Sequence, residues 1–300
     1  MRALCVALLL ITASACGTVQ ADKPSVEVDM RNVDLHVTPQ IDLHVRHLRG
    51  RFIAGGERAA PYLDDPHSYT IAVETGEVAV DLDSLNAIMS GALERAHSNV
   101  SRVQISIDEK GQLRQKGIVK KGISVPFDMK ASLGVTPDGL IRLHSESVKG
   151  FGVPVNPLLK LFRLQTDDLI RVDTGHGIRV DGNDLLLDVS QLLPPPGFHG
   201  KLTSARVERG ALVQVFGSGE ARAISPAATA KNHIYWRGGQ LSFGKLTMTE
   251  TDLELVDEDP RDPFDFSVDR WNEQLVAGYS KTLPNRGLRA HMPDYNDLRR

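Results

Sequence analysis

The hydrophobic pattern is most regular between residues 123 and 135, where apolar and polar positions alternate without interruption. The apolar positions are Ile123, Val125, Phe127, Met129, Ala131, Leu133 and Val135. Strict alternation over this length predicts a β-strand with one buried face and one solvated face. At about 3.3 Å per residue the strand extends for roughly 40 Å, well beyond the usual strand of about five or six residues.

Turn sequences border this strand and its neighbours. Asp-Glu-Lys-Gly at 108–111 and Thr-Pro-Asp-Gly at 136–139 are sequences that reverse a chain tightly. We therefore expect a meander of long antiparallel strands across residues 100–148. A sheet of this length needs an apolar cover for its buried face.

Two segments with helical character are candidate covers. A first helix is predicted from Asp83 to His97, where Asp83 or Ser84 can cap the N-terminus. Spacings of three and four place these residues on one face: Leu85, Ile88, Met89 and Leu93. A second helix is predicted to begin near Pro157. It is apolar on most sides, which calls for burial against more than one neighbour, and it includes Leu158, Leu159 and Phe162.

Alternation predicts further strands before and after the meander. They lie at 25–37, 41–45, 69–80 (two short strands), 177–189, 202–216 and 233–256, with a last helix at 267–279. These elements predict an α+β fold dominated by β-structure, in which a long curved antiparallel sheet wraps around one or two apolar helices. We expect residues 22–230 to form one β-rich domain on which residues 231–282 pack. Residues 283–300 lack periodicity and are expected to form a tail without regular structure.

The N-terminus has the pattern of a secretory signal. A basic dipeptide precedes the apolar run Ala3 to Ile11, and small residues follow. Cleavage that removes residues 1–21 would give an extracytoplasmic protein, periplasmic or secreted. The alternative is a bacterial lipobox at Cys16, which would give a membrane-anchored lipoprotein, although Ala13 stands where such boxes usually have leucine. Cys5 also lies in this segment, so the mature chain has no disulfide.

Composition and motifs exclude several classes of function. The net charge of −3 gives no reason to expect nucleic acid as a partner. The chain has no G-x-S-x-G, H-E-x-x-H or Walker-type sequence, so we predict neither enzymatic activity nor a cofactor. The close pair His44 and His47 would point to opposite faces of a strand and could not hold a metal jointly, so no metal site is predicted.

Basic residues accumulate just before the long strand. They include Arg114, Lys116, Lys120 and Lys121. A solvated strand face with lysines that protect a sheet edge is the favoured explanation. The functional alternative is attraction to anionic lipid headgroups, to which each basic residue near the membrane contributes about 1 kcal/mol.

The apolar residues also have two explanations. Periodicity alone favours an ordinary packed core between the sheet and the helices. The alternative is a tube for acyl chains, for which aliphatic side chains and methionine provide a pliable lining. Its wall would consist of Leu85, Ile88, Met89, Val125, Phe127, Met129, Leu158, Leu159 and Phe162.

The order of these features resembles a known family. An L-x-x-I-M helix is followed by VPFDMKASLGVTPDGLIRL, VPVNPLLKLF, GNDLLLDVSQLLPPP and GKLTSARVERGALVQVF. This series is similar to LmeA-type lipid-binding proteins of the tubular lipid-binding (TULIP) group, over approximately Asp29 to Phe216. The part beyond Ala230, with its GGQLSFGKLTM segment, departs from the small members of that family. The resemblance implies a long sheet around a helix, a hydrophobic groove for phospholipid, and no chemistry.

We therefore expect an extracytoplasmic protein that binds or transfers phospholipid or another acyl-chain lipid. Its partner would be a lipid or a membrane surface. The alternative is a structural scaffold of the cell envelope that binds another protein and has a filled interior. A hydrolase of lipid or glycan ranks last, because nothing in the sequence brings Asp, Glu or His residues into one cleft.

Overall fold

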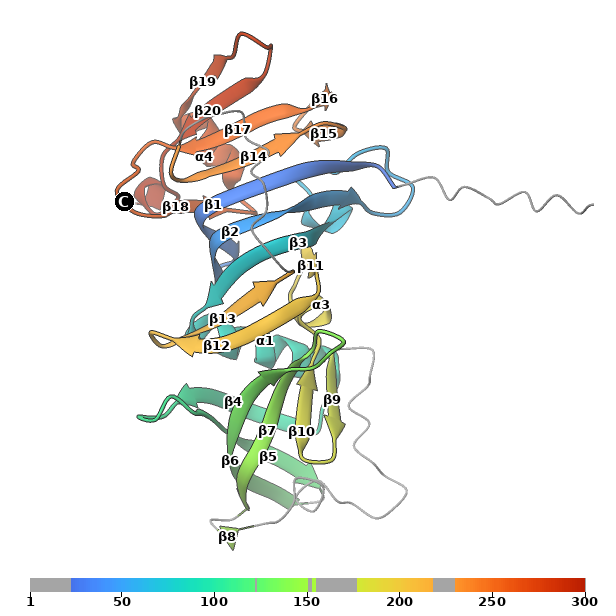
Figure 1. Cartoon of the computed structure of the whole chain (residues 1–300), viewed down its shortest axis with the longest axis vertical. Coiled ribbons are helices and arrows are strands. Elements are labelled where there is room, and N and C mark those ends of the chain that lie inside the picture. Colours follow the sequence, from blue (N-terminus) through green and yellow to red (C-terminus); the bar gives the residue numbers. More distant parts are fainter. Residues whose placement is uncertain (1–22, 122, 151–152, 155–176, 218–229, 300) are drawn as a thin grey trace, which may run out of the picture.

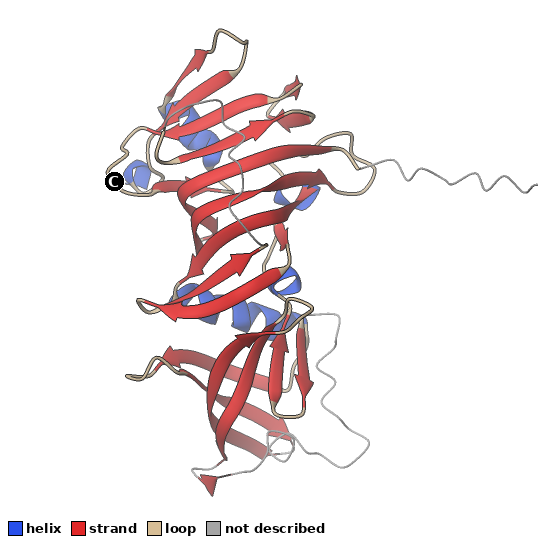
Figure 2. Ribbon diagram, viewed as in Figure 1, coloured by secondary structure: helices blue, strands red, loops and turns tan. Residues whose placement is uncertain are grey.

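A computed structural model describes residues 23–121, 123–150, 153–154, 177–217 and 230–299. Strands make up most of it, and the helices are few and short (Figure 2). Two curved, mostly antiparallel sheets follow one another along the long axis of the molecule, with a helical layer at their junction (Figure 1). The predicted α+β fold dominated by β-structure is confirmed.

The larger of the two, here called the large sheet, contains eleven strands of the described residues. Its main path is β12 (Leu202–Glu208), β13 (Ala211–Phe216), β3 (Tyr69–Val80), β2 (Ile41–Ala54), β1 (Ser25–Thr38), β14 (His233–Arg237), β17 (Asp252–Asp257), β20 (Leu288–Met292) and β19 (Tyr279–Thr282). Two short strands pair in parallel beside this path: β11 (Gly197–His199) on β3 and β18 (Phe264–Ser267) on β1. The first three strands of the chain therefore form the centre, and the C-terminal strands continue the same sheet.

Small elements cover the apolar face of the large sheet. They are the hairpin β15 (Gln240–Phe243) and β16 (Leu246–Thr249), the 3-10 turn η1 (Pro66–Ser68), and α4 (Trp271–Ala277); a second 3-10 turn, η3 (Asp297–Arg299), lies near the C-terminus. Trp271 of α4 meets Phe243 of the hairpin edge to face, with ring centroids 6.1 Å apart. Phe52 of β2 contacts Trp236 of β14 in the same way, at 5.6 Å. An aromatic and aliphatic core thus fills this half of the molecule.

The alternation of buried and polar positions shifts by one residue in both β1 and β2, at neighbouring positions of the two paired strands. Asn32 has a positive φ of 49°, and the register of β2 with β3 shifts between Val45 and His47. Val45 and Leu48 are both buried, so His44 and His47 both lie on the polar face. The prediction that the two histidines point to opposite faces is wrong, because an irregularity of this kind cannot be read from their spacing.

The second sheet, here called the half-barrel sheet, contains the predicted meander. Its order is β4 (Val100–Ile107), β5 (Leu113–Lys121), β6 (Ile123–Val135), β7 (Ile141–Gly150), β10 (Asp184–Leu187) and β9 (Ile178–Asp181), with β8 (Val153–Pro154) beside β7. The strand β6 has the bounds that the alternation predicted. Strong curvature gives this sheet a concave face and a convex face (Figure 1).

Helix α1 (Leu82–Arg95) lies between the two sheets and packs against β2 of one and β4 of the other. Its N-terminal cap is Asp81, whose Oδ1 accepts the N–H of Ser84 at 2.7 Å, and not Asp83 or Ser84 as predicted. The hydroxyl of Ser84 instead accepts the backbone N–H of Asp42 at 2.9 Å, which joins the helix to β2. The short helix α3 (Val189–Leu192) packs beside α1.

Three further expectations are corrected by the structure. Residues 69–80 form the single strand β3, since Gly76 lets its backbone pass within van der Waals distance of β2. The last helix, α4, is shorter than the predicted 267–279. Residues 283–300 are not an unstructured tail, because β20 pairs in parallel with β17 and buries Ala290 and Met292. The predicted helix near Pro157 lies outside the described residues.

Candidate functional site

The concave face of the half-barrel sheet is apolar along most of β6. Met129 lies between Gln115 of β5 and Val148 of β7, and Leu133 lies beside Leu143 of β7. Cross-strand partners point to the same side of a sheet, so these residues share the concave face. Four of the five are apolar. The face can therefore receive an apolar cover, and α1 provides it at the end next to the large sheet.

A cavity of about 20 Å³ lies between this face and α1. It is lined by Leu85, Ile105, Leu113, Gln115, Met129, Ala131, Ile141, Leu143, Leu187 and Leu212. Two of the predicted wall residues, Leu85 and Met129, thus meet in one cavity. Its volume is enough for about one water molecule and far below the several hundred Å³ of an ordinary ligand pocket.

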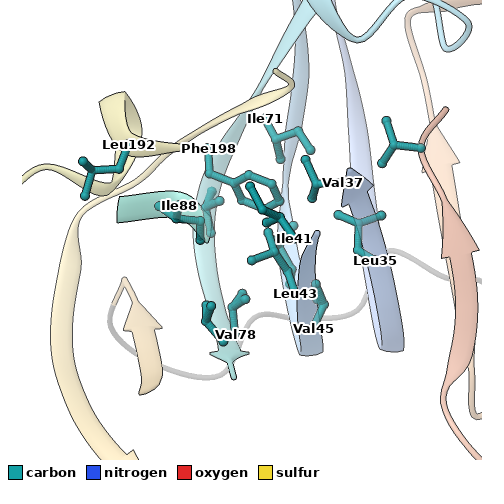
Figure 3. Close-up of a cluster of buried hydrophobic side chains, with 14 of the residues drawn as sticks. Leu35, Val37, Ile41, Leu43, Val45, Ile71, Val78, Ile88, Leu192 and Phe198 are labelled. Atoms are coloured by element: carbon teal, nitrogen blue, oxygen red, sulfur yellow. The ribbon is translucent and has the colours of Figure 1, made fainter. Parts of the chain in front are cut away.

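The other predicted wall residues occupy different positions. Ile88 points toward the core of the large sheet, where Ile41 and Val78 lie (Figure 3). The ring of Phe127 covers Gly117, where an added Cβ would lie 2.7 Å from it. Met89 is buried and Val125 is half-buried. Leu158, Leu159 and Phe162 lie outside the described residues.

An open groove of about 320 Å³ follows the C-terminal end of α1 and the first residues of β4. It has a mixed lining of polar and apolar residues: Ser90, Leu93, Glu94, His97, Ser98, Val100, Ser101, Arg102 and Val103. His97 and Arg102 have positive φ values of 45° and 53°. The register of β4 with β5 shifts beside Arg102. The types of His97 and Arg102 do not indicate a positive φ. The sequence analysis therefore did not predict the irregular backbone that forms this groove.

The predicted headgroup residues lie on the convex face, opposite the cavity. Arg114 donates from Nε to Oδ1 of Asp128 at 2.8 Å and from a second nitrogen to Oδ2. This pairing holds the pKa of the Asp128 carboxyl below its usual range. Lys116 and Lys120 are exposed on the same face, and the side chain of Lys121 lies outside the described residues. These cations can meet a surface but do not line the cavity.

The large sheet has an ionic network on its polar face. Arg46 and Arg206 both pair with Glu77 and Glu208, and the Arg46 Nη2 to Glu208 Oε1 distance is 2.8 Å. The network joins β2, β3 and β12 across the intervening β13. Its four charges satisfy one another, which makes it a structural network rather than a binding site.

His36 makes a second ionic contact on this sheet. Its Nδ1 lies 2.6 Å from Asp42 and its Nε2 lies 3.2 Å from Asp265. Burial opposes protonation of the ring, but the hydrogen bonds to Asp265 and Asp42 outweigh it and raise the pKa of His36 to about 9. The charged imidazole thus ties β1 and β2 to β18.

Neither a metal centre nor a membrane-spanning helix is found in the part of the chain that the structure describes. No three His, Cys, Asp or Glu side chains there are placed to share an ion. None of the helices of that part combines the length and the apolarity that a bilayer crossing requires. No protein family, curated protein or solved structure matches the chain. The resemblance to LmeA-type proteins therefore stays a prediction from sequence features.

Proposed function

We propose that the protein binds a phospholipid or another acyl-chain lipid along the concave face of the half-barrel sheet. The observation that carries this proposal is the apolar concave face of a long curved sheet, on which α1 rests at one end. Burial of acyl chains would provide the binding free energy, at about 0.8 kcal/mol for each methylene group. Extracytoplasmic lipid transfer would follow from uptake at one membrane and release at another.

Binding of this kind requires the interior to open. The cavity beside Met129 measures about 20 Å³, so an acyl chain has to separate α1 from the sheet. Leu85 and Met129 are the first contacts to part, because they line the cavity from opposite sides. Methionine supports such a change, since its flexible side chain repacks at low energetic cost.

The test is lipid uptake by purified mature protein, measured by native mass spectrometry after incubation with liposomes. Ala131→Leu fills the cavity next to Met129 and is expected to lower uptake at least tenfold, since an apolar group then occupies the chain's path. The matched control is Val268→Leu, which fills a second cavity of about 20 Å³ in the core of the large sheet. Both variants add buried volume, but the control is expected to keep normal uptake.

A wild-type protein that carries no lipid and takes none up would overturn the proposal. Equal loss of uptake in both variants would count against the proposed position, because it would show a general effect of overpacking.

The second candidate is a non-catalytic scaffold of the cell envelope. The observation that favours it is the small size of two interior cavities, beside Met129 and beside Phe52, which both measure about 20 Å³. A scaffold would bind a protein partner without taking up lipid. Crosslinking in cells would then recover one reproducible protein partner from a chain that is lipid-free by mass spectrometry.

The proposed site of action is outside the cytoplasm, in the periplasm or beyond it. The intact mass of the mature chain tests this and separates the two forms of processing. A chain that begins at Asp22 corresponds to signal cleavage, and one that begins at a lipidated Cys16 corresponds to a membrane-anchored lipoprotein.

A further inference from the structure

The tip of the β5–β6 hairpin exposes a large aliphatic side chain. Ile123, the first residue of β6, is 66% exposed, and Ser124 and Pro126 beside it are exposed as well. The other apolar residues of β6 at odd positions are at least half-buried. An isolated exposed isoleucine is common on protein surfaces. Its position at the end of a long hairpin makes it accessible to a flat surface.

Basic residues surround this tip on the convex face. Lys120 pairs across the strands with Ser124, and Lys116 and Lys149 are the two partners of Asp128. All three lysines are exposed. The carboxylate of Asp128 is already held by Arg114 in a two-bond contact. Because Arg114 neutralises this carboxylate, the positive potential of the three lysines stays largely uncompensated.

The charge of this end is positive, whereas the whole chain has a net charge of −3. Within residues 100–104, 116–121, 123–128 and 148–150, the described part of the strands near the tip, Asp128 is the one carboxylate. Arg102 on β4 adds another exposed cation in the same rows. A lysine-rich face around an exposed isoleucine is complementary to an anionic bilayer, which offers phosphate at its surface and acyl chains beneath it.

We propose that this tip, formed by Ile123 with Lys116, Lys120 and Lys149, docks the protein on anionic lipid bilayers. The inference extends the proposed lipid binding, on which its purpose rests, to the surface from which lipid is taken. Ile123 inserts at the level of the headgroups, while the lysines contact lipid phosphates. The concave face of the same sheet then lies close to the membrane.

The test is co-sedimentation of full-length mature protein with vesicles of phosphatidylcholine, with or without about a third of phosphatidylglycerol. Binding is expected with the anionic vesicles and not with the neutral ones. Charge removal in Lys116→Gln/Lys120→Gln/Lys149→Gln is expected to weaken binding about a hundredfold, at about fivefold for each lysine. Ile123→Ser is expected to weaken it about tenfold, because the buried apolar area is lost.

Matched controls come from the opposite end of the molecule. Val276 of α4 is 85% exposed and Lys281 of β19 is exposed, so Val276→Ser and Lys281→Gln remove the same types of group without touching the tip. Both are expected to bind as the wild type does. Circular dichroism confirms that each variant is folded. Equal binding of the tip variants and the controls, or no binding of the wild type to anionic vesicles, would overturn the proposal.

The two proposals fail separately in this design. Uptake of a short-chain lipid that is soluble as a monomer needs the concave face but no vesicle. The tip variants are expected to keep this uptake, whereas Ala131→Leu is expected to lose it and still bind vesicles.

Discussion

Asp294 lies in the C-terminal segment just after β20, beside β18, and is only 8% exposed. Its Oδ1 accepts the backbone N–H of Asp265 at 2.8 Å. Burial, together with the nearby carboxylates of Asp257, Asp265 and Asp262, raises the pKa of Asp294 to about 7. An unfolded aspartate ionises at about pH 4, so ionisation of this group favours the unfolded chain as the pH rises from about 4 to about 7.

Asp294→Asn is therefore expected to stabilise the protein relative to the wild type, and this stabilisation is expected to be roughly 2 kcal/mol larger at about pH 6.5 than at about pH 4.5. The amide keeps an oxygen that accepts the Asp265 N–H but carries no charge. Urea unfolding at about pH 4.5 and 6.5 measures the difference. The contribution of His36 stays constant over this window, because the stabilisation from its raised pKa is fully present below about pH 6.5 and is lost between about 6.5 and 9. Identical pH slopes for variant and wild type would contradict the expectation.

His97 follows the C-terminus of α1 in a left-handed conformation, with φ of 45°. Its N–H bonds to the carbonyl of Glu94, and that of Ser98 bonds to the carbonyl of Leu93, both at 3.0 Å. This pair of bonds is a Schellman motif, in which glycine is the preferred residue. We expect His97→Gly to raise the free energy of unfolding by about 1 kcal/mol, since the strain of the Cβ is removed.

Thermal unfolding measures the effect of His97→Gly. Glu94→Gly in the last turn of the same helix is the control, because its backbone is helical and glycine there is expected to cost about 1 kcal/mol. Destabilisation by both substitutions would show that the left-handed position is not strained.

At the scale of the elements, β2 and β3 depend on a glycine at a point where their backbones lie close together. A Cβ at Gly50 would lie 2.1 Å from the carbonyl oxygen of Ala72 and 3.2 Å from Cα of Val73. Both atoms belong to the backbone, which can move only if the register of the strands moves with it. Gly50→Ala is therefore expected to destabilise the protein by about 3 kcal/mol.

The control for Gly50→Ala is Gly134→Ala in β6. An added Cβ there meets only the side chain of Arg142, at 3.6 Å, so the substitution is expected to be neutral or slightly stabilising. Chemical denaturation compares the two. Equal stability of both variants would mean that the sheet adjusts at Gly50 without loss.

At the scale of the whole molecule, α1 joins the two sheets. Ser84 is 2% exposed, and its hydroxyl accepts the N–H of Asp42 in β2, while Asn86 of the same helix accepts the N–H of Ile105 in β4 at 2.6 Å. A helix held from both sides should make the sheets unfold as one unit. Ser84→Ala leaves the Asp42 N–H unpaired and is expected to cost about 2 kcal/mol.

The distinguishing measurement for Ser84→Ala is hydrogen exchange resolved by segment. Protection is expected to fall in β2 of the large sheet and in β5 and β6 of the half-barrel sheet by the same factor. Ser90→Ala, at an exposed position of the same helix, is expected to change neither. Loss of protection confined to the large sheet would show that the sheets unfold independently.

Local pattern was sufficient for the elements whose environment is uniform along their length. The bounds of β6 follow from alternation, because beyond the exposed Ile123 one of its faces is more buried than the other. The helix around Leu85 follows from its spacing, because its apolar residues recur at helical intervals and are buried. The class of fold and two members of the candidate site, Leu85 and Met129, were therefore within reach of the sequence.

Contacts between distant segments decided the rest. Ile88 was expected on the lipid wall but packs toward the large sheet, since a helix between two sheets divides its apolar residues between them (Figure 3). The strand β20 was missed because its pairing partner, β17, is more than thirty residues away. The positive φ of Asn32 and Arg102 likewise depends on neighbouring strands. Periodicity determines which residues are buried, but only the tertiary structure determines against which partner, because burial has no direction in a one-dimensional pattern.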